Sequence, residues 1–312
     1  MPAIQATNLR KVYHGHPAVS DLSITVGRGE VYGFLGPNGA GKTTTVKMLL
    51  GLTRPTSGQA TLLDRPLGDR SARARIGFLP ELFRFHDWLS GLELVLLHGQ
   101  LHGLRGPRLE RRAREVLGVV GLNGRELDKV GGYSKGMQQR VGLATALVND
   151  PELVFLDEPT SALDPLGRRD VREIISVLRE KGVSVFLNSH LLSEVELTCD
   201  RVAIVNKGRV LREGSLSELQ AGSLEVDVTL DALTPALRAK LEPFGKILEA
   251  RPDGLRLSLS NRELLPQISQ TVFESGARLY ALAPRQESLE ELFVRLVEGA
   301  ASSEQPRGGD SA

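Results

Sequence analysis

Short apolar runs alternate with helical periodicities over most of the first 215 residues. Val31–Leu35 and Leu153–Leu156 are continuous apolar runs, which are typical of strands covered on both faces. After the second run, apolar residues between Val171 and Leu178 recur at i, i+3, i+4 and i+7, the spacing of one helix face. The alternation predicts an α/β core with helices packed on a buried sheet.

Other segments extend this pattern in both directions. Further short strands are expected at residues 3–13, 21–26, 76–79, 183–187, 202–205 and 209–212. From 82 to about 140 the pattern becomes helical, and Ser90-Gly-Leu-Glu93 matches the capping box that begins a helix. We therefore expect a helical subdomain inserted in the core, and we expect the whole first domain to span 1–218.

The pattern changes again near residue 222. Leu224–Leu230 and Leu255–Leu259 alternate strictly between apolar and polar, so each strand should have one solvated face. Ser288-Leu-Glu-Glu291 matches a second helix cap. These features predict a small α+β domain at 222–298, ordered β-α-β-β-α-β plus a last helix. Residues 300–312, rich in Ser, Gly, Gln and Pro, are expected to be a disordered tail.

Composition limits the functional classes. The 312 residues are 41% hydrophobic and 25% charged, with a formal net charge of +1, so bulk electrostatics do not indicate a nucleic-acid partner. A single cysteine, Cys199, excludes an internal disulfide. No apolar run approaches the length of a membrane span. Any membrane role is therefore expected to need a partner.

Gly36-Pro-Asn-Gly-Ala-Gly-Lys-Thr43 fits the phosphate-loop pattern G-x-x-x-x-G-K-[ST] without a mismatch. It has the required context of a strand before and a helix after. Backbone N–H groups can turn toward a phosphate, Lys42 can reach the β- and γ-phosphates, and Thr43 can offer its hydroxyl to Mg²⁺. The predicted nucleotide-binding residues here are Gly36, Pro37, Asn38, Gly39, Ala40, Gly41, Lys42, Thr43 and Thr44.

A pair of acidic residues supplies the second part of the chemistry. Asp157 ends the apolar run that begins at Leu153, and Glu158 follows it. At the end of a strand Asp157 can hold Mg²⁺ through water, and a carboxylate beside the γ-phosphate can orient and polarise an attacking water. We predict that Asp157 is a metal ligand and that Glu158 is the general base.

The segment Tyr133-Ser-Lys-Gly-Met-Gln-Gln-Arg140 precedes this strand, and with it the chain resembles the ATP-binding subunit of ABC transporters. That family usually has Leu-Ser-Gly-Gly-Gln here. This chain keeps Ser134 and Gly136 and departs at Tyr133, Lys135 and Met137. The residues of this segment resemble those of a subset of the family, exporters with multidrug, antibiotic or polysaccharide cargo. Ser134 is a good helix N-cap, and Gly136 lets a phosphate approach the helix N-terminus closely.

Other positions match the family one by one. The resemblance implies that Tyr13 stacks on adenine and that His190 touches the γ-phosphate as a switch histidine. It also implies that Ser161-Ala-Leu-Asp164 links two active sites across a dimer. Glu81 stands where the family usually has a glutamine that reaches Mg²⁺, in a loop that touches the membrane partner. The implied metal-binding residues are therefore Thr43, Glu81 and Asp157.

Lys135 is unusual, because a cation at the positive end of a helix is unfavourable unless an anion docks there. One interpretation is that Lys135 neutralises the γ-phosphate of an ATP held by a second subunit. The alternative is a lysine that extends into solvent.

The resemblance implies a head-to-tail pair of subunits, whether two copies or one copy with a homologous subunit. Each ATP, with Mg²⁺, would lie between Lys42 of one subunit and Ser134, Lys135, Gly136 and Met137 of the other, with Asp164 at the same seam. A separate polytopic membrane subunit would use this cycle for export, which places the chain at the cytoplasmic face of the membrane. Two alternatives stay open: a soluble ABC-type ATPase acting on ribosomes or nucleic acid, and an ATPase gated by a ligand-sensing C-terminal domain.

The expected fold class is accordingly α/β. It combines a P-loop NTPase core, an antiparallel β region near the N-terminus, the inserted helical subdomain and the C-terminal α+β domain.

Overall fold

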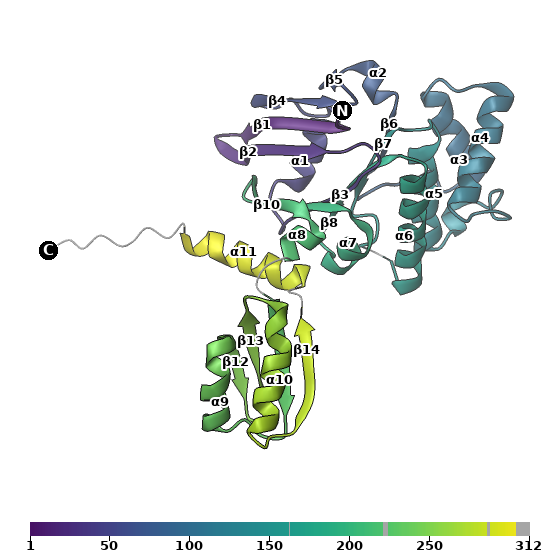
Figure 1. The fold of residues 1–312 in the computed structure, drawn as a ribbon. Helices are drawn as coiled ribbons and strands as arrows, with labels where there is room; N and C mark the ends of the chain where they lie inside the picture. Colours follow the sequence, from purple (N-terminus) through teal and green to yellow (C-terminus); the bar gives the residue numbers. More distant parts are fainter. Residues whose placement is uncertain (162, 221–223, 286–287, 304–312) are drawn as a thin grey trace. The chain divides into compact units, whose positions relative to one another are not determined.

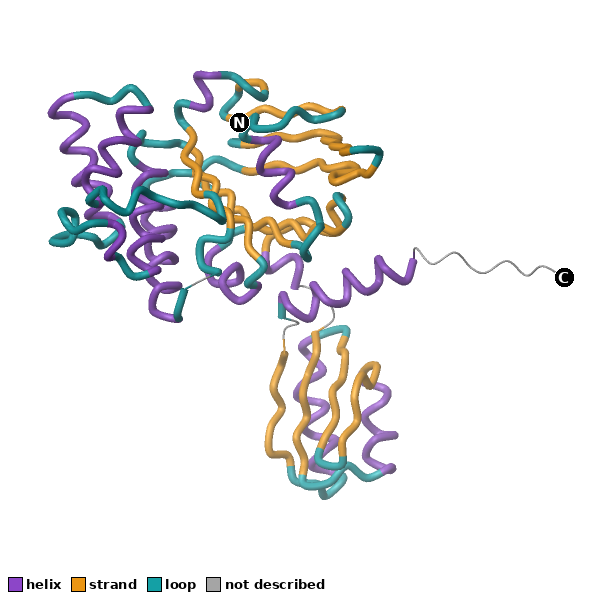
Figure 2. Tube along the Cα trace, turned by 180° about the vertical axis from the view of Figure 1, so that it is seen from behind, coloured by secondary structure: helices purple, strands orange, loops and turns teal. Residues whose placement is uncertain are grey.

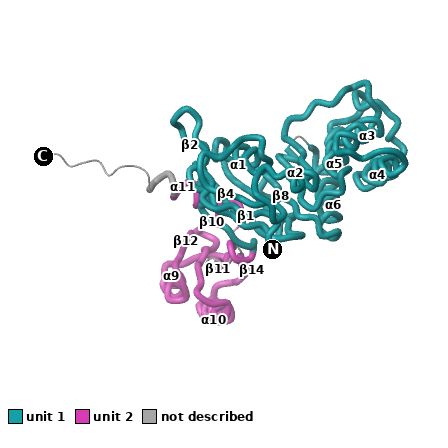
Figure 3. Tube along the Cα trace, turned by 90° about the horizontal axis from the view of Figure 1, so that it is seen from above, with its two compact units in different colours: residues 1–216 teal, residues 217–312 magenta. Residues whose placement is uncertain are grey.

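The structure, a computed structural model, describes residues 1–161, 163–220, 224–285 and 288–303. It divides into two compact units, residues 1–216 and residues 217–312, coloured separately in Figure 3. In the described part, no helix is both long and apolar enough to span a bilayer. Each unit has its own sheet, and the two are described separately below.

A ten-stranded sheet forms the first unit, with the spatial order β5-β4-β1-β2-β10-β9-β3-β8-β7-β6 (Figure 1). The strands are β1 (Ile4–Tyr13), β2 (His16–Val26), β3 (Val31–Leu35), β4 (Ser57–Leu62), β5 (Arg65–Pro66), β6 (Ile76–Leu79), β7 (Leu153–Asp157), β8 (Ser184–Ser189), β9 (Arg201–Asn206) and β10 (Arg209–Ser215).

The strands β9, β3, β8, β7 and β6 form a parallel block. Every residue of β3 and β7 is buried, as predicted from their continuous apolar runs, and every residue of β8 is buried as well. In the core, the ring centroid of Phe186 lies 5.2 Å from that of Phe34 and 5.2 Å from that of Phe155, on the two neighbouring strands. The carboxyl ends of β3, β8, β7 and β6 consequently lie along one edge of the sheet, where open α/β sheets bind ligands.

The antiparallel region near the N-terminus consists of β1, β2, β4 and β5. Here β2 begins at His16, five residues before the predicted start at 21. The missed residues include the exposed His16 and Pro17 and only one fully buried apolar side chain, Val19, so they lack the alternation that identifies a strand. Pairing with β1 holds them in the sheet.

Helices follow the strands as the sequence predicts. In the first unit they are α1 (Lys42–Leu49), α2 (Arg70–Arg73), α3 (Gly91–Leu101), α4 (Gly106–Val119), the 3₁₀ turn η1 (Val130–Gly132), α5 (Lys135–Leu147), α6 (Pro165–Glu180), α7 (Leu192–Thr198) and α8 (Leu216–Gln220), which crosses the unit boundary.

The inserted helical region consists of α3, α4 and α5, which pack against one another beside the parallel strands (Figure 1). The capping box at the start of α3 is confirmed. The Glu93 backbone N–H donates to Ser90 Oγ over 3.2 Å, and the Ser90 N–H donates to Glu93 Oε2 over 2.7 Å. The last helix of this region, α5, ends at Leu147, seven residues beyond the expected limit of the subdomain at about 140.

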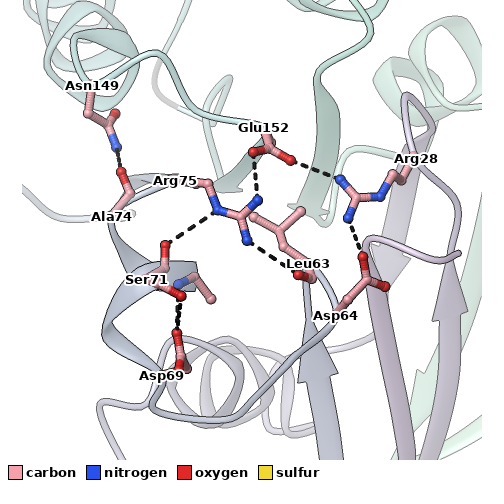
Figure 4. A network of polar contacts seen from close by, with 10 residues as sticks. Arg28, Leu63, Asp64, Asp69, Ser71, Ala74, Arg75, Asn149 and Glu152 are labelled. Atoms are coloured by element: carbon pink, nitrogen blue, oxygen red, sulfur yellow. Dashed lines mark hydrogen bonds and ion pairs between the residues drawn. The ribbon is translucent and has the colours of Figure 1, made fainter.

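A polar network ties the antiparallel region to the parallel block at the edge opposite to the strands' carboxyl ends (Figure 4). Glu152, just before β7, accepts a hydrogen bond from Arg75 and another from Arg28, each over 2.8 Å. Arg28 also pairs with Asp64 over 2.6 Å. These four side chains come from four separate segments, so the network connects parts of the chain that the sequence keeps far apart.

Glu152→Gln should lower the free energy of unfolding at pH 7 by about 1 kcal/mol, because it weakens two half-exposed ion pairs that are each worth about 0.2–1 kcal/mol. Burial acts to raise the pKa of Glu152, but the hydrogen bonds from Arg75 and Arg28 hold that pKa below its ordinary value. A carboxylate with a lowered pKa stabilises the folded state above its unfolded pKa of about 4.3. That contribution is lost as the pH falls through the folded pKa.

The measurement is urea unfolding followed by circular dichroism at several pH values between 7 and 3. The difference between wild type and Glu152→Gln should be constant from pH 7 to 5 and should shrink below pH 4. Glu173→Gln is the control, because Glu173 is exposed and pairs with Arg169 of its own helix. Equal stability of both variants would contradict the assigned role of the network.

The second unit is a four-stranded antiparallel sheet with two helices on one face (Figures 1 and 2). Its element order, β-α-β-β-α-β and a last helix, is the predicted one, and the strand order β12-β13-β11-β14 makes it ferredoxin-like. The elements are β11 (Leu224–Leu230), α9 (Pro235–Leu241), η2 (Glu242–Phe244), β12 (Gly245–Arg251), β13 (Gly254–Leu259), η3 (Arg262–Leu264), α10 (Leu265–Glu274), β14 (Leu279–Arg285) and α11 (Leu289–Ser303).

The strict alternation in β11 and β13 has the expected result. Val226, Val228, Leu255 and Leu257 are buried in one core with residues of α9 and α10, while the alternate positions are partly exposed. On that exposed face Arg256 pairs with Asp227 over 3.0 Å. The face without helices is therefore charged.

Near the C-terminus the structure differs from the expected limits of domain and tail. Helix α11 begins after the predicted Ser288 cap, where the Glu291 N–H donates to Ser288 Oγ over 3.2 Å. It continues to Ser303, so the helix includes the start of the segment 300–312 that the composition assigned to a tail. The remainder of that segment, 304–312, lies outside the described residues.

Candidate functional site

The site lies at the carboxyl edge of the parallel strands. Since β3, β8, β7 and β6 are neighbours in the sheet, the segments that follow them come close together in space. The phosphate loop follows β3, Asp157 and Glu158 stand at the end of β7, His190 follows β8, and Glu81 follows β6. The topology thus brings together groups from four segments that lie far apart in the sequence, from Gly36 to His190.

The phosphate loop, residues 36–44, joins β3 to α1. The loop is held in place by the turn between β9 and β10, because the Gly208 N–H donates to the Ala40 carbonyl over 3.0 Å. Gly41 has φ +95°, and a Cβ there would lie 2.4 Å from the Ala18 carbonyl oxygen, so only glycine fits. Thr43 is exposed at the start of α1, where its hydroxyl is available.

Lys42 is buried against the loop that it follows. Its Nζ donates to the Gly36 carbonyl over 2.7 Å and to the Pro37 carbonyl over 3.4 Å. Burial lowers the pKa of Lys42, while the charges of Glu158, Asp157 and Glu81 act to raise it. All three carboxylates predicted for the site therefore act electrostatically on this lysine.

Asp157 is 4% exposed at the end of β7. Burial raises its pKa; a hydrogen bond from the Asn188 side-chain amide acts against this, and the charges of Glu81 and Glu158 add to it. A carboxylate in such surroundings gains from a nearby cation, since both burial and the like charges disfavour its ionised form.

Glu158 adopts an uncommon backbone conformation with φ +54°, in the left-handed region. Its N–H donates to the Asn188 carbonyl over 2.8 Å, and its side chain is 8% exposed. Glu158 Oε2 lies 2.7 Å from His190 Nδ1 and also accepts from the His190 backbone N–H over 3.4 Å. The predicted general base and the predicted switch histidine are therefore in direct contact.

The donors present fit a magnesium ion that is held partly by substrate. No group of three or more His, Cys, Asp or Glu side chains in the described ranges is arranged to hold a metal by itself. Mg²⁺ is usually bound by one or two carboxylates together with substrate phosphates and waters. A hydroxyl from Thr43 and the buried Asp157 carboxylate match that requirement, and Glu81 is an exposed carboxylate nearby.

The segment that carries the family resemblance lies apart from this cluster. Ser134 is the N-cap of α5, and its Oγ accepts from the Met137 N–H over 3.2 Å, as predicted. Ser134 and Lys135 are exposed, and a Cβ on Gly136 would meet only Ser134 Oγ, at 4.0 Å. Among the described residues, no hydrogen bond joins Ser134–Met137 to Lys42, Asp157 or Glu158. The helix N-terminus is thus open to another molecule.

Tyr133 explains one departure from the family pattern. Its ring is buried, and its hydroxyl donates to the Arg125 carbonyl over 2.7 Å. A leucine at this position could not make that hydrogen bond. The tyrosine therefore anchors the loop that leads into the Ser134 cap.

Tyr13 is 41% exposed at the end of β1, so one part of its ring is available for stacking. Lys11 Nζ lies 4.9 Å from the ring centroid and donates to the Arg54 carbonyl over 2.7 Å. Asp164 caps α6 by accepting from the Gly167 N–H over 2.9 Å. Both residues occupy positions open to a ligand or partner, and their functional roles stay predictions.

Sequence reasoning missed two residues that organise the site. Asn188 holds both acidic residues of the β7 end, and Gly208 holds the phosphate loop. A polar residue at the end of an apolar run was the available signal for Asn188. The role of Gly208 depends on a contact with a segment about 170 residues away and left no local signal.

Comparisons with known proteins agree with this geometry. The ABC transporter family matches residues 19–161. An uncharacterised ABC transporter ATP-binding protein of Synechocystis is 42% identical over 89% of this chain and 78% of its own length. The Nod factor export ATP-binding protein I of Cupriavidus metallidurans is 36% identical over 94% and 96%. A solved dimer of an ATP-binding cassette with ADP and Pi has a TM-score of 0.62, with 28% identity over 68% of this chain and 98% of the other.

The fold and the site define an ATP-hydrolysing P-loop protein. The chain belongs to the ATP-binding proteins of ABC transporters, and its expected fold class and ATPase activity are confirmed. This membership favours transport over the alternative of a ribosome- or nucleic-acid-directed ATPase. Proteins of this class work with membrane subunits and as dimers.

Proposed function

We propose that this chain drives export by closing on ATP as a head-to-tail dimer and reopening after hydrolysis. The observation that carries the proposal is the contact between Glu158 and His190 in the same site as the buried Lys42, together with an exposed Ser134 cap that makes no hydrogen bond to these groups in the described part of the chain. Each subunit has its own groups for hydrolysis. The exposed helix N-terminus at Ser134 is the group that a second subunit would present to the phosphates bound by the first.

Within one subunit, the proposed roles follow from position. Lys42 and the phosphate-loop N–H groups bind the phosphates, and Glu158 takes a proton from the attacking water. His190, hydrogen-bonded to Glu158, orients that carboxylate and contacts the γ-phosphate. Tyr13 stacks on adenine. Mg²⁺ would be held by Thr43 and Asp157 with Glu81 near it, and would neutralise charge on the phosphates when bound.

The surface around Glu81 is proposed to contact the membrane subunit. After Glu81 the loop exposes Leu82 and Trp88, which are 87% and 67% exposed. Next to them a pocket of about 330 Å³ is lined by Phe83, Arg84, Phe85, Asp87, Val130 and Gln138. Large exposed apolar side chains beside a pocket are typical of interaction sites. With a carboxylate at position 81, a basic group on the partner would be complementary.

The direction of transport is proposed from two sources. The residues of the Ser134 segment resemble those of exporters. A relative that aligns with 94% of this chain is named for Nod factor export. Both support an exporter that acts at the cytoplasmic face of the membrane. A ligand-sensing role of the second unit stays an open prediction.

Lys135→Ala tests the proposed dimer. If Lys135 neutralises the γ-phosphate held by the second subunit, its loss should weaken ATP-dependent dimerisation about two- to fivefold, because one charge interaction at an exposed helix terminus contributes about 0.3–1 kcal/mol. Sedimentation velocity of the full chain with Mg²⁺ and a non-hydrolysable ATP analogue measures the dimer. Lys181→Ala, an exposed lysine at the end of α6, is the matched control.

Two results would contradict the proposal at different levels. Unchanged dimerisation of Lys135→Ala would show that this lysine extends into solvent. A wild-type chain that stays monomeric at every analogue concentration would remove the proposed dimer itself.

A further inference from the structure

Asn188 is the buried polar residue that connects the two acidic residues of the site. It is the fifth residue of β8, it lies directly across from Asp157 in the β7–β8 pairing, and its side chain is 1% exposed. The family resemblance assigns it no role.

Each end of this residue makes a defined contact. The side-chain Nδ2 donates to Asp157 Oδ1, and the backbone carbonyl accepts from the Glu158 N–H over 2.8 Å. One asparagine thus orients the Asp157 carboxylate and also holds the left-handed backbone of Glu158. A substitution of Asn188 would therefore alter the surroundings of both acidic residues.

The other side-chain atom of Asn188 is an acceptor without a partner. Oδ1 is fully buried and makes no hydrogen bond to any described residue. The amide cannot be turned to pair it with Asp157, because two oxygen acceptors would then face each other. Buried polar atoms are nearly always paired with protein or water, so an unpaired acceptor beside a site carboxylate needs an explanation.

We infer that Asn188 is a positioning residue of the magnesium site. Its amide N–H fixes Asp157 so that the second carboxylate oxygen is available to the cation, and its Oδ1 accepts a hydrogen bond from water that accompanies the ion. The inference rests on the proposed function, since it needs Mg²⁺ to bind with the nucleotide. Mutation of a residue that hydrogen-bonds to a metal ligand typically lowers the affinity for the metal about 10- to 100-fold.

The test is Asn188→Leu in the full chain carrying Glu158→Gln, which blocks turnover. Affinity for a fluorescent ATP analogue is measured twice, in EDTA and in saturating Mg²⁺, and the ratio of the two dissociation constants is the magnesium effect. We expect affinity in EDTA to stay within about twofold, because the phosphate loop is intact. The magnesium effect should fall at least about tenfold.

Asn206→Leu is the matched control, because Asn206 is another buried asparagine at the end of a core strand and, within the ranges that the structure describes, makes no hydrogen bond to Asp157 or Glu158. Its magnesium effect should equal that of the parent, and thermal unfolding should show both variants folded. An unchanged magnesium effect in Asn188→Leu would overturn the inference. Equal weakening in EDTA and in Mg²⁺ would also overturn it, since that pattern indicates a merely structural role.

A third outcome separates this inference from the proposed function. If the Glu158→Gln parent bound the analogue in neither condition, the nucleotide site itself would be wrong, and both proposals would fall together. If the parent binds normally and Asn188→Leu behaves as the parent does, only the role of Asn188 falls.

Discussion

Glu158→Gln should bind ATP about as tightly as the wild type and hydrolyse it about 10²- to 10⁴-fold more slowly, the usual contribution of a general base. Glutamine keeps the size of the side chain and can still contact His190, but it cannot take a proton from water. The left-handed backbone at this position is unchanged, so the protein should fold normally. ATP-bound dimer should accumulate, since the step that reopens it is blocked.

Phosphate release gives the rate, fluorescent-nucleotide titration gives the affinity, and sedimentation gives the dimer. Glu180→Gln, at the exposed end of α6, is the control and should hydrolyse ATP at the wild-type rate. Wild-type turnover in Glu158→Gln would remove Glu158 as the base and leave the proton acceptor to another group of the site.

Lys42→Met should have the second large effect, on binding as well as on rate. Methionine fills similar space without a charge, so the buried position next to the Gly36 carbonyl stays occupied. Loss of charge-assisted bonds to phosphate should weaken ATP about 10- to 100-fold. Loss of a preorganised cation should slow hydrolysis by about 10²- to 10³-fold more.

Titration with a fluorescent ATP analogue and single-turnover hydrolysis at saturating nucleotide separate these two contributions. Lys47→Met changes an exposed lysine of the same helix α1 and should leave both unchanged. Wild-type ATP affinity in Lys42→Met would show that the loop backbone alone holds the phosphates.

The sequence predicted the parts of the fold that local patterns determine. β3, β6 and β11 begin and end where their apolar or alternating runs do, and both helix caps form. These features depend on residues within one turn or one strand, so one chain segment contains the whole signal. The missed start of β2 is the opposite case, because pairing with β1 decides it.

The same division applies to the site. Lys42, Asp157 and Glu158 could be predicted because each belongs to a short segment with its own chemistry. For Asn188 the sequence offered only a polar residue at the end of an apolar run, and its role could not be predicted, since that role depends on which residue of β7 lies across from it. The network of Arg28, Glu152 and Arg75 also depends on long-range contacts, and no periodicity records those. Register and topology, rather than composition, supply this information.

Gly208 has a consequence for the natural variation of this chain. Its N–H donates to Ala40, its carbonyl accepts from Ser20 and Asp21, and with φ +73° a Cβ would lie 2.6 Å from Val19 Cα. Three distant stretches of backbone thus meet at one residue that has no spare room. Inserting or deleting even one amino acid in the turn between β9 and β10 would displace Gly208 and distort the phosphate loop that it holds. Length differences among homologous chains should therefore avoid this turn and accumulate in other surface loops.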